Sequence, residues 1–215
     1  MTVRAPLIFP LCLFVGALLV TAAALTHPLL TGDGPAQLAR IAASPAWPAV
    51  HWAFLFGFPL CITGLAGVAG VHAGTPGEGA ARAGLVVAVF AYAGWMIVVA
   101  FMLGAGGALA GAYAAGAPGL AATRAVFLYD MLRPFALTAQ RTGGFALGCA
   151  TCLFGWGWWN GKVGPRWLGA LALAGGAAGA ALALAAPAES RLDQAAFAPP
   201  VAWQLVTAAV MLRKR

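Results

Sequence analysis

The chain has 215 residues, of which 62% are hydrophobic and only 8% are charged. A soluble domain of this length carries about 25% charged residues, so the composition excludes an ordinary water-soluble globular protein. The formal net charge of +7 comes from basic residues beside apolar runs, where such residues set membrane topology and do not indicate nucleic acid binding. We therefore expect a single transmembrane domain over residues 1–215, with the lipid bilayer as its main partner.

Four long apolar runs and two weaker ones predict the membrane spans. A run of about 18 or more apolar residues crosses the roughly 30 Å hydrocarbon core as a helix. Helices are required because backbone amides in lipid must be paired within the segment. The first run follows Arg4 and imitates a secretory signal, but it is longer than the apolar core of such signals. The predicted spans are residues 6–26, 48–71, 83–103, 143–159, 167–186 and 199–212.

The basic residues predict that both chain ends face the cytoplasm. In this all-α, six-span bundle, seven of the twelve Lys and Arg residues lie on the cytoplasmic side, the side that positive charge favours. Residues 104–119 are uncharged but consist mostly of Gly and Ala. A separate span there would move the basic C-terminus across the membrane. We expect the third helix to run on past the membrane or to end in a Gly-rich turn.

Two short amphipathic helices are predicted on the outer side. The first covers residues 37–43, with Asp33 or Gly34 as its cap and Pro35 in its first turn. The second covers residues 120–133, whose apolar residues fall on one helical face, and Pro134 should interrupt it.

Glycines at helical spacing predict close helix contacts within the membrane. They occur in the second and fifth spans, and the same faces could equally hold a homo- or hetero-oligomer together. These glycines are Gly64, Gly67, Gly70, Gly175 and Gly179.

Short motifs spread over most of the chain resemble a broad group of small bacterial multi-pass membrane proteins of unknown function. The motifs are His27-Pro28, WPAVHW at 47–52, GLAG at 64–67, GPRWLGALALAGG at 164–176 and the basic LRKR at the C-terminus. The resemblance implies a helical membrane bundle. It implies no activity and no catalytic residues.

His27 and His51 are the first candidate site. One ends the first span and the other begins the second, so we expect both at similar depth near the outer leaflet. Two neutral imidazoles there could bind haem iron or another transition metal, or a quinone. Alternatively, each histidine caps a helix end or makes an interfacial hydrogen bond. The spacing matches no known metal motif, so the metal and the cofactor stay undetermined.

Further polar residues form a second candidate site on the outer side. If the bundle brings them to the histidines, they could bind a lipid headgroup, a quinone or a small anion; otherwise they are solvated loop charges and snorkelling arginines. This outer polar cluster consists of Asp33, Arg124, Asp130, Gln140 and Arg141.

Within the spans, Gln204 is the clearest polar residue, and such residues are costly in lipid. Interhelical hydrogen bonding is the ordinary explanation, and a transport path is the alternative. Cys149 and Cys152 share a helix face inside a span. Buried small residues explain them better than thiol redox chemistry, which needs accessible sulfurs.

No nucleotide-binding, metalloprotease or serine hydrolase motif occurs in the sequence. The leading interpretation is a non-enzymatic structural or accessory component of the bacterial inner membrane, which predicts a dry bundle packed by Gly and Ala. The first alternative is a haem- or quinone-binding redox protein using His27 and His51. The second is a small-solute transporter or channel, which needs a polar path past Gln204.

Overall fold

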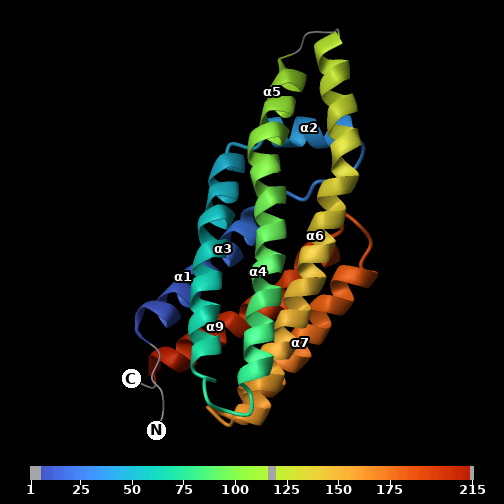
Figure 1. Ribbon diagram of the computed structural model, residues 1–215. Helices are drawn as coiled ribbons and strands as arrows, with labels where there is room; N and C mark the ends of the chain where they lie inside the picture. Colours follow the sequence, from blue (N-terminus) through green and yellow to red (C-terminus); the bar gives the residue numbers. More distant parts are fainter. Residues whose placement is uncertain (1–5, 116–119, 214–215) are drawn as a thin grey trace.

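The chain folds into an all-α bundle (Figure 1). The computed structural model describes residues 6–115 and 120–213. Its elements are α1 (Ile8–Thr26), α2 (Gly34–Ala42), α3 (Trp47–Gly70), α4 (Glu78–Phe101), the π-helical η1 (Met102–Gly106), α5 (Gly107–Ala114), α6 (Leu120–Gly161), α7 (Arg166–Ala185), α8 (Arg191–Gln194), the 3₁₀-helical η2 (Ala195–Phe197) and α9 (Ala198–Arg213).

Within the described residues, five helical segments are long and apolar enough to cross a membrane, so this is a multi-pass membrane protein. They are Ile8–Thr26, Trp47–Gly70, Glu78–Ala114, Arg166–Ala185 and Arg191–Arg213. The predicted span at 143–159 lies inside α6, which is not among the five. The segment at 143–159 contains many glycines and tryptophans. These residues lower its mean hydropathy, which explains why α6 is not among the five.

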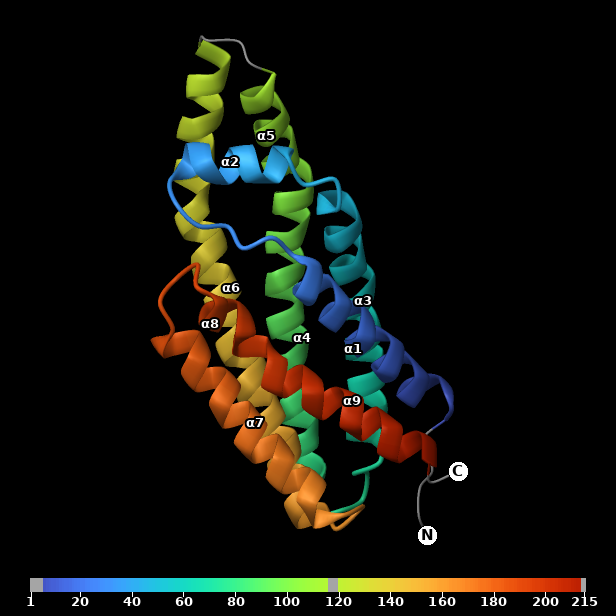
Figure 2. The same cartoon turned by 180° about the vertical axis from the view of Figure 1, so that it is seen from behind.

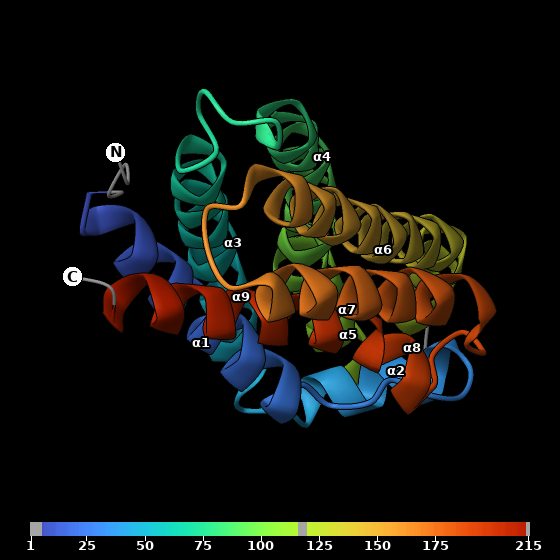
Figure 3. The same ribbon diagram turned by 90° about the horizontal axis from the view of Figure 1, so that it is seen from below.

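Six helices pack in a ring that follows their order along the chain. Contacts join α1 to α3, α3 to α4, α4 to α6, α6 to α7, α7 to α9, and α9 back to α1. The view along the bundle in Figure 3 shows this arrangement, and Figure 2 shows α9 running beside α7 and α1. α6 is therefore an integral wall of the ring, held between α4 and α7.

A long helical hairpin extends beyond the ring. The helix that begins as α4 continues without a break through η1 into α5. This confirms the prediction that the third helix runs on beyond residue 103. The separate helix predicted for 120–133 is wrong, because α6 continues through Pro134 without ending. Pro134 is exposed, where solvent can pair the backbone carbonyl that the proline leaves without an N–H donor.

α2 lies across this hairpin (Figure 1), and its predicted start is confirmed. The Asp33 side chain accepts a hydrogen bond from the Ala36 backbone N–H at 3.0 Å, and a proline occupies the first turn. We call this end of the molecule the α2 end. The opposite end, with the connections at 71–77 and 162–165, is called the turn end.

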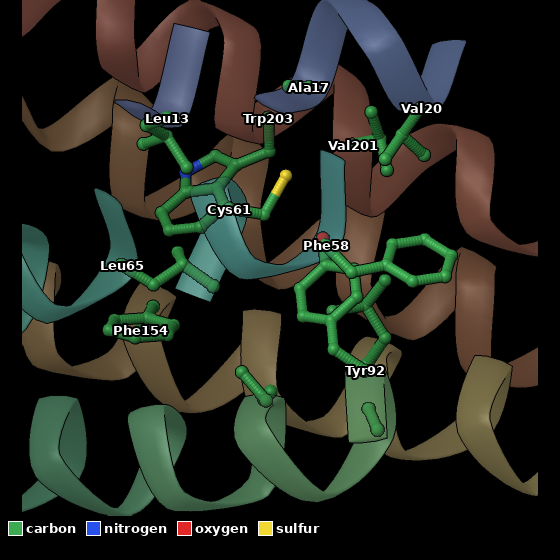
Figure 4. Close-up of a cluster of buried hydrophobic side chains, with 14 of the residues drawn as sticks. Leu13, Ala17, Val20, Phe58, Cys61, Leu65, Tyr92, Phe154, Val201 and Trp203 are labelled. Atoms are coloured by element: carbon green, nitrogen blue, oxygen red, sulfur yellow. The ribbon is translucent and has the colours of Figure 1, made fainter. Parts of the chain in front are cut away.

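Glycine contacts hold the ring together, as the sequence predicts. A Cβ on Gly64 would lie 2.6 Å from the Leu13 backbone nitrogen, where α3 meets α1. A Cβ on Gly179 would lie 2.7 Å from the Ala196 carbonyl oxygen, where α7 meets the chain before α9. Gly70 has open space around it. Larger side chains fill the interior, including Phe58, Tyr92 and Trp203 (Figure 4).

Candidate functional site

A chamber of about 150 Å³ lies toward the α2 end of the bundle. Its walls come from the C-terminal end of α1, Gln37 of α2, the first half of α3, the second half of α4, the middle of α6 and the connection between α7 and α9. The chamber therefore draws on six parts of the chain. It has an apolar middle, with histidines in one part of its wall and charged residues in another.

His27 and His51 meet in the chamber wall, with ring centroids 5.2 Å apart. His27 directly follows α1, and His51 lies one turn into α3. The chain between them runs through α2 and returns, and this path brings the two helix ends together. The Trp47 ring lies 4.1 Å from His51 and 5.3 Å from His27, centroid to centroid. The two histidines that the sequence singles out therefore belong to one aromatic cluster.

Hydrogen bonding fixes the orientation of the His51 ring. Its Nδ1–H donates to the Trp47 carbonyl oxygen at 2.7 Å, and only 2% of His51 is exposed. Because a neutral imidazole carries one N–H, Nε2 is then an acceptor. Burial, and next the neighbouring His51, lower the pKa of His27 to about 4, against a smaller opposing effect from a hydrogen bond to the Pro28 backbone. His27 is therefore uncharged at neutral pH.

Aromatic side chains form the middle of the chamber. Phe54 and Phe58 stack along α3, with ring centroids 5.5 Å apart. Trp95 of α4 packs edge-on against Phe197, and its Nε1–H donates to the Gln140 carbonyl oxygen at 2.8 Å. This middle section suits the apolar body of a ligand, because flat rings favour aromatic contacts.

An ion pair stands at the chamber's polar side. Arg133 of α6 and Glu189 of the α7–α9 connection form a salt bridge, in which Arg133 Nε donates to Glu189 Oε1 at 2.6 Å. Gln37 Nε2 donates to the same carboxylate at 3.0 Å, and the Tyr129 hydroxyl donates to Gln37 Oε1 at 2.8 Å. Glu189 has a backbone φ of 59°, an unusual conformation for a non-glycine residue. The network ties α2, α6 and the connection together.

A second charged pair lies beside it. Arg141 approaches Asp193 at 3.9 Å, and the Gln140 side chain donates to Asp193 at 3.3 Å. Arg141 also donates to the carbonyl oxygens of Ala183 and Ala186, both at 2.9 Å. These carbonyls end α7 and lack helical partners, so the guanidinium caps that helix. The role of Arg141 is at least partly structural.

The outer polar cluster predicted from the sequence is divided between separate places. Gln140 and Arg141 line the chamber together with the histidines. Asp33 caps α2, and the exposed Asp130 carboxylate packs against Gly34 at the start of the same helix. Arg124 is exposed on α6, nearer the tip of the hairpin. The structure therefore does not bring these five residues together.

Gln204 lies outside the chamber lining and is fully buried between α9 and α4. Its side chain exchanges hydrogen bonds with the Tyr92 hydroxyl, the interhelical bonding that the sequence suggests. Cys149 and Cys152 are partly buried in α6 as free thiols. His72 at the turn end is fully buried against Trp158, with ring centroids 5.2 Å apart.

Five residues of the chamber's polar side escaped prediction from sequence. The signal that could have found two of them is the rarity of acidic residues, of which the chain has only five. Two of those five, in a short connection between apolar helices, require buried or interfacial partners. The residues not foreseen are Gln37, Tyr129, Arg133, Glu189 and Asp193.

The separation of the His27 and His51 rings is that of two rings in direct contact, and it is too short for a haem between them. Two axial imidazoles of a haem have ring centres about 6 Å apart, given metal–nitrogen bonds of about 2 Å. The observed separation is 5.2 Å with the rings tilted by 56°, so the rings would have to move apart. Within residues 6–115 and 120–213, no group of three His, Cys, Asp or Glu residues is placed to hold a metal ion.

The chamber is thus an aromatic space with acceptor nitrogens in one part of its wall and paired charges in another.

Comparisons with protein-family models, curated proteins and solved structures found no match to this chain.

Proposed function

We propose that this protein crosses a bacterial inner membrane six times and binds a small ring-bearing ligand, of about the size of a quinone or quinol headgroup, in the chamber. The observation that carries the binding proposal is the pairing of His27 and His51 in the wall of an aromatic-lined space of about 150 Å³. A dry bundle packed by Gly and Ala, as a purely structural component would have, needs no such space.

Size and chemistry both favour a single ring. A protein cavity of about 150 Å³ is large enough for a benzene molecule. Phe54, Phe58 and Trp95 offer ring faces and edges to such a body. The histidines and the charged pairs offer polar contacts, the usual design of a small-molecule site.

Six spans are supported by the ring of helices. α6 is packed between α4 and α7, both of which are candidate spans. A helix enclosed by two crossing neighbours shares their depth. Lys162 and Arg166 lie beside exposed indoles at the turn end, at Trp156, Trp159 and Trp167. Tryptophans are typical of either membrane interface, and basic residues are typical of the cytoplasmic side, which favours an arrangement with both chain ends inside. The bacterial assignment rests on the sequence resemblance.

Cysteine labelling tests this orientation. Ser44→Cys places a thiol in the α2–α3 connection, and Thr75→Cys places one in the α3–α4 turn. In intact cells, a membrane-impermeant maleimide should label position 44 and reach position 75 only after lysis. The reverse result would overturn the orientation. The protein without either added cysteine is the background control, because its own thiols are buried or partly buried.

A ligand series with a space-filling variant tests the binding proposal. We expect hydroquinone or 1,4-dimethoxybenzene to bind the detergent-purified protein in calorimetry and to raise its unfolding temperature. Ala136→Phe puts a ring into the chamber wall and should abolish binding, whereas Ala121→Phe adds the same ring to an exposed part of α6. Ala24→Phe fills the chamber from α1 as a second variant. Absence of binding by every probe would refute the proposal.

A structural or accessory role is the second candidate function. The observation in its favour is a set of exposed apolar side chains on the part of α6 that belongs to the protruding hairpin. Such a face can dock another protein. Its members are Leu120, Phe127, Leu128, Met131, Leu132 and Phe135.

A further inference from the structure

The N–H groups around the histidine pair are already used. The His51 Nδ1–H donates to the Trp47 carbonyl oxygen at 2.7 Å. The Trp47 Nε1–H donates to the Met102 carbonyl oxygen at 3.1 Å, and the Trp95 Nε1–H donates to the Gln140 carbonyl oxygen at 2.8 Å. Three ring donors at this wall are thus directed into the protein backbone, away from a ligand.

The histidines themselves remain as acceptors. With Nδ1 of His51 donating, Nε2 carries a free lone pair in the neutral ring. Burial lowers the pKa of His27 to about 4, so its ring is uncharged as well. A neutral imidazole has one N–H and one acceptor nitrogen. The wall formed by the pair therefore demands a hydrogen-bond donor.

The rest of the chamber favours a neutral molecule. Its charged residues form the pairs Arg133–Glu189 and Arg141–Asp193, which balance each other. A cationic ligand would meet no net negative charge, and an anionic ligand would find both guanidinium groups already paired. A charged ligand would have to be desolvated without compensation, which is unfavourable in a buried site.

We propose that the chamber selects a neutral ring bearing a hydroxyl group, a phenol or a quinol, whose O–H donates to Nε2 of His51. This inference rests on the proposed function, because it names the ligand class of the same site. A quinone carbonyl or an ether oxygen only accepts hydrogen bonds. Either would place its lone pairs against those of the histidine and leave the buried nitrogen without a partner.

A matched series of rings separates this inference from the proposed function. Hydroquinone, 4-methoxyphenol and 1,4-dimethoxybenzene differ in how many hydroxyl hydrogens are replaced by methyl groups. We expect the first two to bind at least about tenfold tighter than the dimethyl ether, which corresponds to about 1.4 kcal/mol, because the ether leaves the buried acceptor without a hydrogen bond. The probe 2,6-dimethyl-1,4-benzoquinone should bind more weakly than its quinol.

Histidine variants assign the effect to His51. His51→Phe keeps an aromatic ring and removes the acceptor. In this variant the hydroxyl-bearing rings should bind about as tightly as the dimethyl ether, whose own affinity should not change. His72→Phe alters the histidine at the opposite end of the bundle and should preserve the preference. Because the wild-type series tests the inference by itself, a failure of either variant to fold leaves the result interpretable.

The outcomes are distinct. Equal affinity for all three rings, abolished by Ala136→Phe, would overturn the hydroxyl preference and leave the chamber as a ligand site. Tighter binding of the ether or the quinone would overturn it as well. Absence of binding by the whole series would overturn both the inference and the proposed function.

Discussion

Tyr92 of α4 and Gln204 of α9 exchange two hydrogen bonds in the interior of the bundle. The Tyr92 hydroxyl approaches Gln204 Oε1 at 2.9 Å and Gln204 Nε2 at 2.8 Å, and both residues are at most 1% exposed. α4 and α9 lie on different sides of the ring. The pair therefore links two opposite walls of the ring through its interior.

Removal of one partner of this pair should destabilise the protein by about 1–2 kcal/mol, because the other is left unpaired in an apolar surrounding. Gln204→Leu and Tyr92→Phe should each lower the unfolding temperature. The double variant should lose less than the two single losses combined, since no unpaired group remains. Strict additivity in this cycle would contradict an energetic coupling between the two side chains.

A methyl group at Gly64 should weaken the packing of α3 on α1. The Cβ of Gly64→Ala would lie 2.6 Å from the Leu13 backbone nitrogen, and backbone atoms cannot rotate away. We expect a loss of about 3 kcal/mol, the upper end for overpacked cores. Gly94→Ala is the control, because nothing lies within 4 Å of its Cβ. That variant should be neutral or slightly more stable, and equal thermal shifts for both would contradict the close contact.

Lys162 follows the last residue of α6 with a backbone φ of 55°. Glycine adopts this left-handed conformation without strain and commonly ends helices. Lys162→Gly should therefore stabilise the protein by about 0.5–1 kcal/mol despite the extra freedom of glycine in the unfolded chain. Lys162→Ala removes the same charge and keeps the strain, so it should give no such gain. A stabilised alanine variant would point to charge as the cause.

Acid should destabilise the turn end through His72. Burial lowers the pKa of His72 from 6.5 to about 4, and its ring nitrogens have no hydrogen-bond partner among the described residues. Between pH 6.5 and 4 the unfolded chain binds a proton that the folded protein excludes, so stability falls as pH falls, by up to about 3 kcal/mol. The unfolding temperature of His72→Phe should depend less on pH than that of the wild type. Parallel pH profiles would contradict this assignment.

Much of the architecture follows from the sequence because lipid imposes simple rules. Apolar length predicts the helices, and Asp33 with Pro35 predicts the start of α2. The continuous α6 was not predictable, because Pro134 normally ends a helix and only its exposed position lets the helix continue.

The site was predictable only in part. His27 and His51 stand at adjoining span ends, so their meeting follows from threading the chain through the membrane. The partners of Arg133 lie 56 and 101 residues away, at Glu189 and at the Gly32 carbonyl oxygen. No local pattern encodes such contacts. They depend on how the α2 segment and the α7–α9 connection fold over the hairpin, which only the assembled bundle determines.

The length of the hairpin has a practical consequence for experiments. Residues 78–114 form 37 residues of helix, or about 55 Å at 1.5 Å per residue, nearly twice the roughly 30 Å of the hydrocarbon core. Upright, such a helix extends into the headgroups or the water beyond. α2 lies across that part of the helix, and its Gln37 is hydrogen-bonded to Glu189, the partner of Arg133. In this position α2 is accessible from the water as an epitope. A soluble antibody fragment raised against residues 34–42 would therefore bind the protein without itself entering the lipid.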